Sequence, residues 1–195
     1  MIYGKMDNVC HIIGNGYSRE LFKDNEGIKI GLNYYGVKKV DILFAIDDIA
    51  IKHLENNNFY DTPTVINNTY ETKNKNVIDR VDAHKKKLPF TLENYPKGSR
   101  FSFNAGHCAF LWAKKKGYEK IHMWGFDVLF NGSLLSLSDD LFGHSKEYKT
   151  NEKFVNKARY YIDIWNKIVD TPIYINMPTG QKLKTTNDNI IGVNV

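Results

Sequence analysis

Short apolar runs, each followed by a turn or a helix-like stretch, recur along this chain of 195 residues. Runs of this length between turn residues are typical of buried strands, and their alternation with helical patterns predicts a mostly parallel sheet covered by helices on both faces. The strands are expected at 9–13, 28–33, 41–46, 63–66, 120–124 and 172–176. We therefore predict an α/β fold, a three-layer sandwich formed by a single domain over 1–195.

The stretches between these runs predict the helices. Helical patterns fall at 18–24, 48–55 and 105–116, and apolar residues at three- and four-residue spacing predict a long amphipathic helix over 154–168. Residues 67–100 are polar, contain one helix-like patch at 77–84, and form either a flexible insertion or a cover over a site. The polar tail from residue 179 is expected to be peripheral.

Composition indicates which class of protein this is and in which compartment it is expected. A hydrophobic content of 42% with 25% charged residues is ordinary for a soluble globular protein. No apolar run approaches the ~20 residues that span a bilayer, and residues 1–13 lack the layout of a signal peptide. We expect a cytoplasmic protein without a transmembrane segment. Cys10 and Cys108 are expected to be buried free thiols rather than a disulfide, and because they lack Cys-x-x-Cys spacing they are not expected to bind a metal.

The net charge of +5 permits an anionic partner such as a nucleotide, an anionic glycan or nucleic acid. The lysine runs at 85–87 and 114–116 are expected to be solvated surface, and no nucleic-acid-binding motif accompanies them. Nucleic acid is therefore an unfavoured partner. A homo-oligomer is left open.

Polar residues and glycines follow the first three strands. Gly14-Asn15-Gly16-Tyr17-Ser18 follows the first, Asn33 ends the second, and Asp47 ends the third. Glycines let a backbone approach a ligand phosphate, and the helix that follows offers free N–H groups. The alternative is a turn that merely connects strand to helix. Asp47-Asp48 is most simply a helix cap with a first-turn acid, although the pair could hold a metal with a phosphate.

The stretch 104–146 is the most informative. A helix opens on Asn104-Ala105-Gly106, and the strand at 120–124 stops at Gly125-Phe126-Asp127. Ligands of open α/β sheets bind at such strand ends. The polar residues just beyond this strand end are therefore candidates for substrate binding: Asp127, Asn131, Ser133, His144, Ser145 and Lys146. His144 follows a glycine in an irregular segment, and imidazole can take a proton near neutral pH. His107 and His122 are expected to be packed.

In their order these motifs resemble a known family. Gly14-Asn15-Gly16-Tyr17-Ser18 is similar to the Gly-Asn-Gly-Pro-Ser loop of the bacterial lipooligosaccharide sialyltransferases of glycosyltransferase family 42. The helix and strand from Ala105 to Asp127, then Asn131-Gly132-Ser133 and Gly143-His144-Ser145-Lys146, resemble later segments of the same family.

The resemblance implies a Rossmann-like fold that transfers a sugar from a cytidine-monophosphate (CMP) donor to a glycan hydroxyl, with no metal or other cofactor. Residues 128–151 would form a short lid inserted in the domain, which excludes water. His144 would be the general base, and Asp127 would position the loop or the donor. The remaining residues that the resemblance assigns to substrate binding are Gly14, Asn15, Gly16, Ser18, Asn33, Asp47, Asn104, Ala105, Gly106, Gly125, Asn131, Ser133, Ser145 and Lys146.

Some positions depart from the family pattern. The family carries lid tyrosines that stabilise the departing phosphate, whereas here Leu135 follows Ser133 by two places and the next tyrosine is Tyr148. Ala105 stands in place of a serine, and Asp47 in place of an asparagine. Two alternatives therefore stay open. One is a magnesium-dependent nucleotide-using enzyme similar to the pterin diphosphokinases, with the metal on Asp47-Asp48. The other is a non-catalytic nucleotide-binding or structural protein on the same fold.

Overall fold

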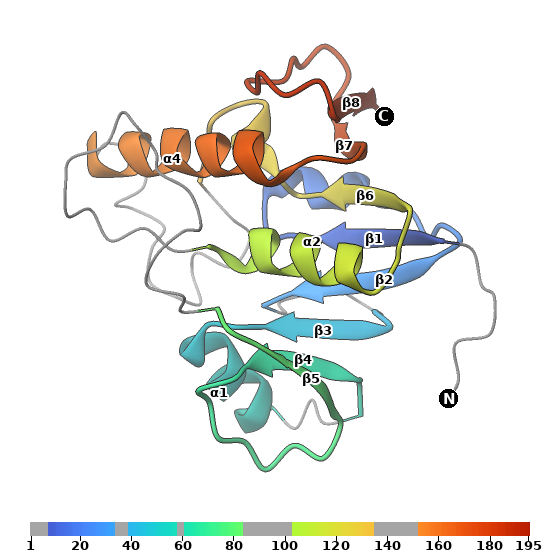
Figure 1. Cartoon of the computed structure of the whole chain (residues 1–195), viewed down its shortest axis with the longest axis vertical. Coiled ribbons are helices and arrows are strands. Elements are labelled where there is room, and N and C mark those ends of the chain that lie inside the picture. Colours follow the sequence, from blue (N-terminus) through green and yellow to red (C-terminus); the bar gives the residue numbers. More distant parts are fainter. Residues whose placement is uncertain (1–7, 34–38, 58–60, 84–102, 135–151) are drawn as a thin grey trace.

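A computed structural model describes residues 8–33, 39–57, 61–83, 103–134 and 152–195 of the chain. Within these residues, eight strands form one sheet in the order β5-β4-β3-β2-β1-β6-β7-β8, and every neighbouring pair is parallel (Figure 1). The strands are β1 Val9–Ile13, β2 Ile28–Leu32, β3 Ile42–Ala45, β4 Thr64–Asn67, β5 Val77–Val81, β6 Lys120–Trp124, β7 Ile173–Met177 and β8 Ile190–Asn194. The predicted Rossmann-like α/β fold with a mostly parallel sheet is confirmed.

The topology contains a switch point beside β1. From β1 the chain adds β2 to β5 on one side, then returns to place β6 on the other side of β1 and continues to β8. The loops after β1 and β6 therefore leave the same edge of the sheet in opposite directions. Crevices of this kind at the carboxyl ends of strands are where open α/β sheets bind ligands.

Helices pack on both faces of the sheet, with more helices on one face than on the other. The helices are α1 Asp48–Asn56, α2 Ala105–Lys115 and α4 Glu152–Ile168, with short 3₁₀ helices η1 Tyr17–Leu21 and η2 Asp127–Leu129. Alternate residues of β3 divide between two apolar clusters: Phe44 packs with α2 and α4, whereas Leu43 and Ala45 pack with α1. This division is the period-two alternation expected of a strand buried on both faces.

Two elements differ from the sequence-based expectation. The prediction of a helix-like patch at 77–84 was wrong, because Val77–Val81 is the edge strand β5. Its apolar residues 77 and 81 are four apart, a spacing that places two side chains on one face of either a helix or a strand. The tail from residue 179 is not wholly peripheral, because Ile190–Asn194 forms the opposite edge strand β8 and Ile190 is buried.

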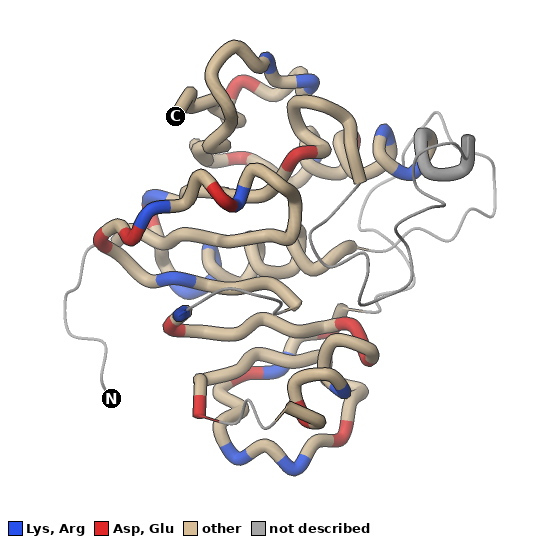
Figure 2. Tube along the Cα trace, turned by 180° about the vertical axis from the view of Figure 1, so that it is seen from behind, with Lys and Arg blue, Asp and Glu red and all other residues tan. Residues whose placement is uncertain are grey.

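The structure also shows the surroundings of the two cysteines and of several charged residues. Cys10 and Cys108 are free and buried, as expected, and burial raises the pKa of each thiol to about 12. Lys114 pairs with Asp170, so the run 114–116 is not simply solvated, and residues 85–87 lie outside the described part. Acidic and basic positions are interspersed along the described trace (Figure 2). Among the described helices, none has the length and apolar character to cross a membrane.

Candidate functional site

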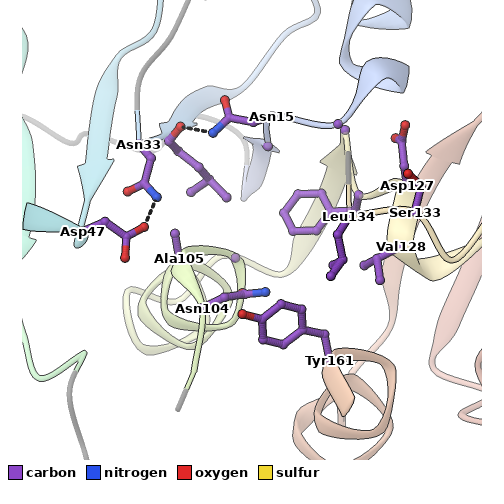
Figure 3. Close-up of a pocket in the computed structure, with 16 residues that line it drawn as sticks. Asn15, Asn33, Asp47, Asn104, Ala105, Asp127, Val128, Ser133, Leu134 and Tyr161 are labelled. Carbon is purple, nitrogen blue, oxygen red and sulfur yellow. Dashed lines mark hydrogen bonds between the residues drawn. The ribbon is translucent and has the colours of Figure 1, made fainter. Parts of the chain in front are cut away.

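A pocket opens at the carboxyl ends of β1, β2, β3 and β6, beside the switch point (Figure 3). It is bounded by the loops after these strands, the first turn of α2, the segment after η2 and one side chain of α4. Its lining residues are Gly14, Asn15, Gly16, Leu32, Asn33, Asp47, Asn104, Ala105, Gly106, Gly125, Phe126, Asp127, Val128, Ser133, Leu134 and Tyr161. Most of the residues that the sequence singled out at strand ends therefore share one crevice.

Two glycine loops pack backbone to backbone at the carboxyl ends of β1 and β6. The Gly16 N–H donates to the Gly125 carbonyl at 3.0 Å. A Cβ on Gly16 would lie 2.6 Å from that carbonyl oxygen and 2.7 Å from Asp127 Oδ1. Gly16 itself has an ordinary φ of −64°, so glycine is needed here for close approach and not for an unusual backbone angle. The loop is thus more than a simple connector, because it forms the pocket wall together with residues 125–127.

Asp127 supports this wall from within the protein. Its side chain is only 4% exposed and accepts hydrogen bonds from the Ser18 N–H, at 3.2 and 3.3 Å to its two oxygens, and from the Ser18 hydroxyl. Burial raises the pKa of Asp127, and the bonds from Ser18 act in the opposite direction. Ser18, which was expected to border the donor, is not among the lining residues and instead ties η1 to the end of β6.

A second polar pair lies across the pocket, just beyond the carboxyl ends of β2 and β3. Asn33 has a positive φ of 45°, and its side-chain carbonyl accepts from the Ile46 N–H at 3.2 Å. Its amide nitrogen therefore points outward and donates to Asp47 (Figure 3). Asp47 occupies the N-cap position of α1, but its side chain makes no capping bond there. Its carboxylate faces the pocket instead, while Asp48 is not a lining residue.

The first turn of α2 supplies the floor of the pocket. Asn104 caps the helix: its side-chain oxygen accepts from the His107 N–H at 3.0 Å. Helix geometry leaves the N–H groups of Ala105 and Gly106 without an intrahelical acceptor. A Cβ on Gly106 would lie 2.5 Å from the Phe126 ring, so this glycine lets α2 approach the loop after β6. The floor thus presents hydrogen-bond donors at the positive end of a helix dipole.

Other expected site residues lie elsewhere. Asn131 is exposed and accepts from the Ser133 N–H at 2.7 Å, so it shapes the turn beside the pocket without lining it. His107 is fully buried beneath Asn104, and His122 packs on the far face of the sheet between His11 and Tyr174. The predictions for His144, Ser145, Lys146 and most of the lid 128–151 fall outside the described residues.

Five lining residues were not predicted from the sequence: Leu32, Phe126, Val128, Leu134 and Tyr161. Phe126 and Val128 flank Asp127 and could have been included by adjacency. Tyr161 could not, because it lies on the apolar stripe of α4 and its spacing is that of a core residue. Figure 3 shows its hydroxyl turned toward Asn104.

Comparisons with known proteins give one distant structural relationship. No family model and no curated protein matches the chain. One solved structure that resembles it is the sialyltransferase CstII from Campylobacter jejuni in complex with a substrate analogue, CMP-3FNeuAc. The two chains are 17% identical, the match covers 86% of this chain and 79% of the other, and the TM-score is 0.41. At this level the roles of individual residues do not transfer from one chain to the other.

Proposed function

We propose that this protein is a nucleotide-sugar-dependent glycosyltransferase of sialyltransferase-like type, which transfers a sugar from a CMP-type donor to a glycan hydroxyl. The observation that carries the proposal is the convergence of Gly14–Gly16, Asn33, Asp47 and Asn104–Gly106 on one pocket at the switch point. The resemblance of the sequence motifs assigns the same residues to the donor.

The pocket suits a ligand with an anionic end and a hydroxyl-bearing end. Asn104, Ala105, Gly106 and Tyr161 provide donors at the floor, which suits a phosphate. Asp47 lies with Asn33 on another side of the pocket, where a carboxylate can accept hydrogen bonds from sugar hydroxyls (Figure 3). A nucleotide sugar carries both kinds of group.

In the proposed reaction the acceptor hydroxyl oxygen forms a bond to the anomeric carbon as the bond from that carbon to the phosphate oxygen breaks. The bonding electrons leave with CMP, and His144 takes the proton of the acceptor hydroxyl. Donors fixed in place by the protein stabilise the charge that develops on the phosphate. This scheme requires no metal or other cofactor.

The test measures binding and turnover separately. Thermal shifts with CMP, UMP, GMP and AMP, each with and without magnesium, should show stabilisation by CMP that is independent of magnesium. Release of CMP from a CMP-sugar in the presence of glycan acceptors should survive a metal chelator. Stabilisation that requires magnesium would favour the diphosphokinase-like alternative, and no nucleotide-induced shift would favour the non-catalytic one.

The catalytic base is tested by His144→Ala. A general base contributes about 10² to 10⁴-fold in rate, so turnover should fall by that factor while CMP affinity stays within about twofold, since the base acts on the acceptor. His53→Ala, on α1 and outside the pocket lining, is the matched control and should turn over at the parent rate. A His144→Ala variant that transfers sugar at the parent rate would remove the proposed role.

A further inference from the structure

We infer that His107 is a positioning residue that holds the side chains of Asn104 and Tyr161 in the orientation that binds the phosphate of the ligand. This inference rests on the proposed nucleotide-sugar function and names a residue that acts through its neighbours, since His107 does not line the pocket. Three observations support it: a reciprocal cap, a ring contact and complete burial.

The reciprocal cap determines which way the Asn104 amide faces. The His107 N–H donates to Asn104 Oδ1 at 3.0 Å, and the Asn104 N–H donates to His107 Nδ1 at 3.1 Å. Because Oδ1 is occupied by the helix, the Nδ2 group with its two donors is the part of Asn104 left for the pocket. The bond to His107 Nδ1 holds the Asn104 backbone N–H, so its loss would leave the bond from the His107 N–H to Oδ1 as the remaining half of the reciprocal cap.

The same bond determines the state of the histidine. A ring nitrogen that accepts a hydrogen bond carries no proton, so the neutral ring has its proton on Nε2. His107 is 0% exposed, and burial lowers its pKa to about 3, with a smaller effect of opposite sign from the backbone of Tyr161. The ring therefore stays neutral across the physiological range, and the cap is insensitive to pH there.

The ring of His107 also supports Tyr161. The two rings meet edge to face with centroids 5.6 Å apart, and the His107 ring also packs on Trp165 at 4.7 Å and Phe103 at 5.9 Å. This packing restricts the tyrosine ring, whose hydroxyl is turned toward Asn104 (Figure 3). One buried side chain thus contacts a pocket residue that caps α2 and a pocket residue of α4, which are 57 positions apart in the chain.

A histidine that only stabilised the helix would affect folding but not the preference of the pocket for an anion. The measured quantity is therefore the phosphate contribution, the ratio of the dissociation constant of a nucleoside to that of its monophosphate. Calorimetric titrations use cytidine and CMP, and the same pairs for uridine, guanosine and adenosine. Thermal unfolding of each variant reports stability separately.

His107→Phe keeps a ring against Tyr161 and removes the acceptor for Asn104. We expect its phosphate contribution to fall about tenfold, the size of one hydrogen bond to a charged group, while nucleoside affinity changes less than about twofold. His107→Gln retains an acceptor of the kind found in capping boxes, and its phosphate contribution should recover to within about threefold of the parent, since only the ring contact is lost.

Two further variants keep the inference testable if His107→Phe does not fold. Asn104→Asp preserves the capping oxygen but replaces the amide donors with negative charge, so it should abolish the phosphate contribution without loss of stability. Tyr161→Phe removes only the hydroxyl and should lower the phosphate contribution. Tyr160→Phe, the same change at a buried neighbour that does not line the pocket, is the matched control and should not.

The outcomes separate this inference from the proposed function. An unchanged phosphate contribution in His107→Phe, or an equal loss for nucleoside and monophosphate, would overturn the positioning role even if the wild-type protein releases CMP from a CMP-sugar. A phosphate contribution that is seen only with another nucleoside and is lost in His107→Phe would support the positioning role while removing the CMP donor. Absence of binding by every monophosphate and by inorganic phosphate would overturn both.

Discussion

At the scale of single residues, Gly16 determines how closely the loops after β1 and β6 approach. A methyl group there would meet the Gly125 carbonyl, which accepts from the Gly16 N–H itself, and the Asp127 carboxylate, which Ser18 holds in place. Gly16→Ala should therefore lower the free energy of unfolding by about 1–3 kcal/mol, as for other overpacked sites, and weaken nucleotide binding. Urea unfolding and calorimetric titration measure the two effects.

Gly117→Ala is the control for this prediction. Gly117 has a φ of +90°, but a methyl group on it would meet nothing within 4 Å, so only the backbone angle is affected. That change should cost about 1–2 kcal/mol and leave binding unchanged. Parent-like stability and binding in Gly16→Ala would mean that the two loops can separate without consequence.

At the scale of elements, Asp79 connects the edge strand β5 to the C-terminal end of α2 through side-chain contacts. Asp79 Oδ2 accepts from Trp112 Nε1 at 2.9 Å and lies 2.8 Å from Lys116 Nζ. The bond from Lys116 is the main cause that lowers the pKa of Asp79 to about 2. Because the pair is about one-third exposed or more, Asp79→Asn should lower the free energy of unfolding by only about 1 kcal/mol.

The pH dependence of the free energy of unfolding and a pair of lysine variants test this contact. A carboxyl with a lowered folded-state pKa stabilises the fold above its unfolded pKa and loses that effect as the pH falls toward about 2. The difference between parent and Asp79→Asn should therefore shrink between about pH 4 and pH 2. Lys116→Met should reproduce the loss at neutral pH, whereas Lys115→Met, on the exposed neighbour, should not. Equal effects of the two lysine variants would contradict the prediction.

At the scale of the whole molecule, three packed histidines link stability to pH. Burial is the main cause that lowers the pKa of His11, of His122 to about 4 and of His107 to about 3. As the pH falls, these histidines bind protons at a higher pH in the unfolded chain than in the folded protein. The free energy of unfolding is therefore greatest above the pKa of the unfolded histidines and falls as the pH drops toward the pKa values of the folded ones. Each histidine can contribute up to about 1.4 kcal/mol per pH unit, and His122 contributes less because it is only partly buried.

Urea unfolding from about pH 7.5 to pH 4.5 measures this slope. Asp127 acts against it, because its raised pKa lets the folded protein bind a proton first. His122→Gln should flatten the curve without removing the slope due to His11 and His107. A free energy of unfolding that stays constant over this range would show that the packed histidines do not control acid stability.

Features that depend on neighbouring residues could be predicted from the sequence. Apolar runs between turn residues identified six of the eight strands described, since a buried strand and its turns are encoded within a short local stretch. Polar residues and glycines beside apolar runs can be recognised from the local sequence, and this is how the sequence predicted the glycine loops, Asn33, Asp47 and Asn104. His144 as the base stays a prediction from the sequence.

What those residues contact depends on how the elements pack together, and this could not be predicted from the sequence. The edge strands β5 and β8 form by pairing with β4 and β7. Their own sequences are short and partly polar, so the local pattern did not predict a strand at either place. Ser18 contacts Asp127, 109 positions away, in place of the expected ligand. Tyr161 lines the pocket because α4 packs against α2 through His107. Local patterns specify an element and its buried face, but only the packing of elements brings distant side chains into one site.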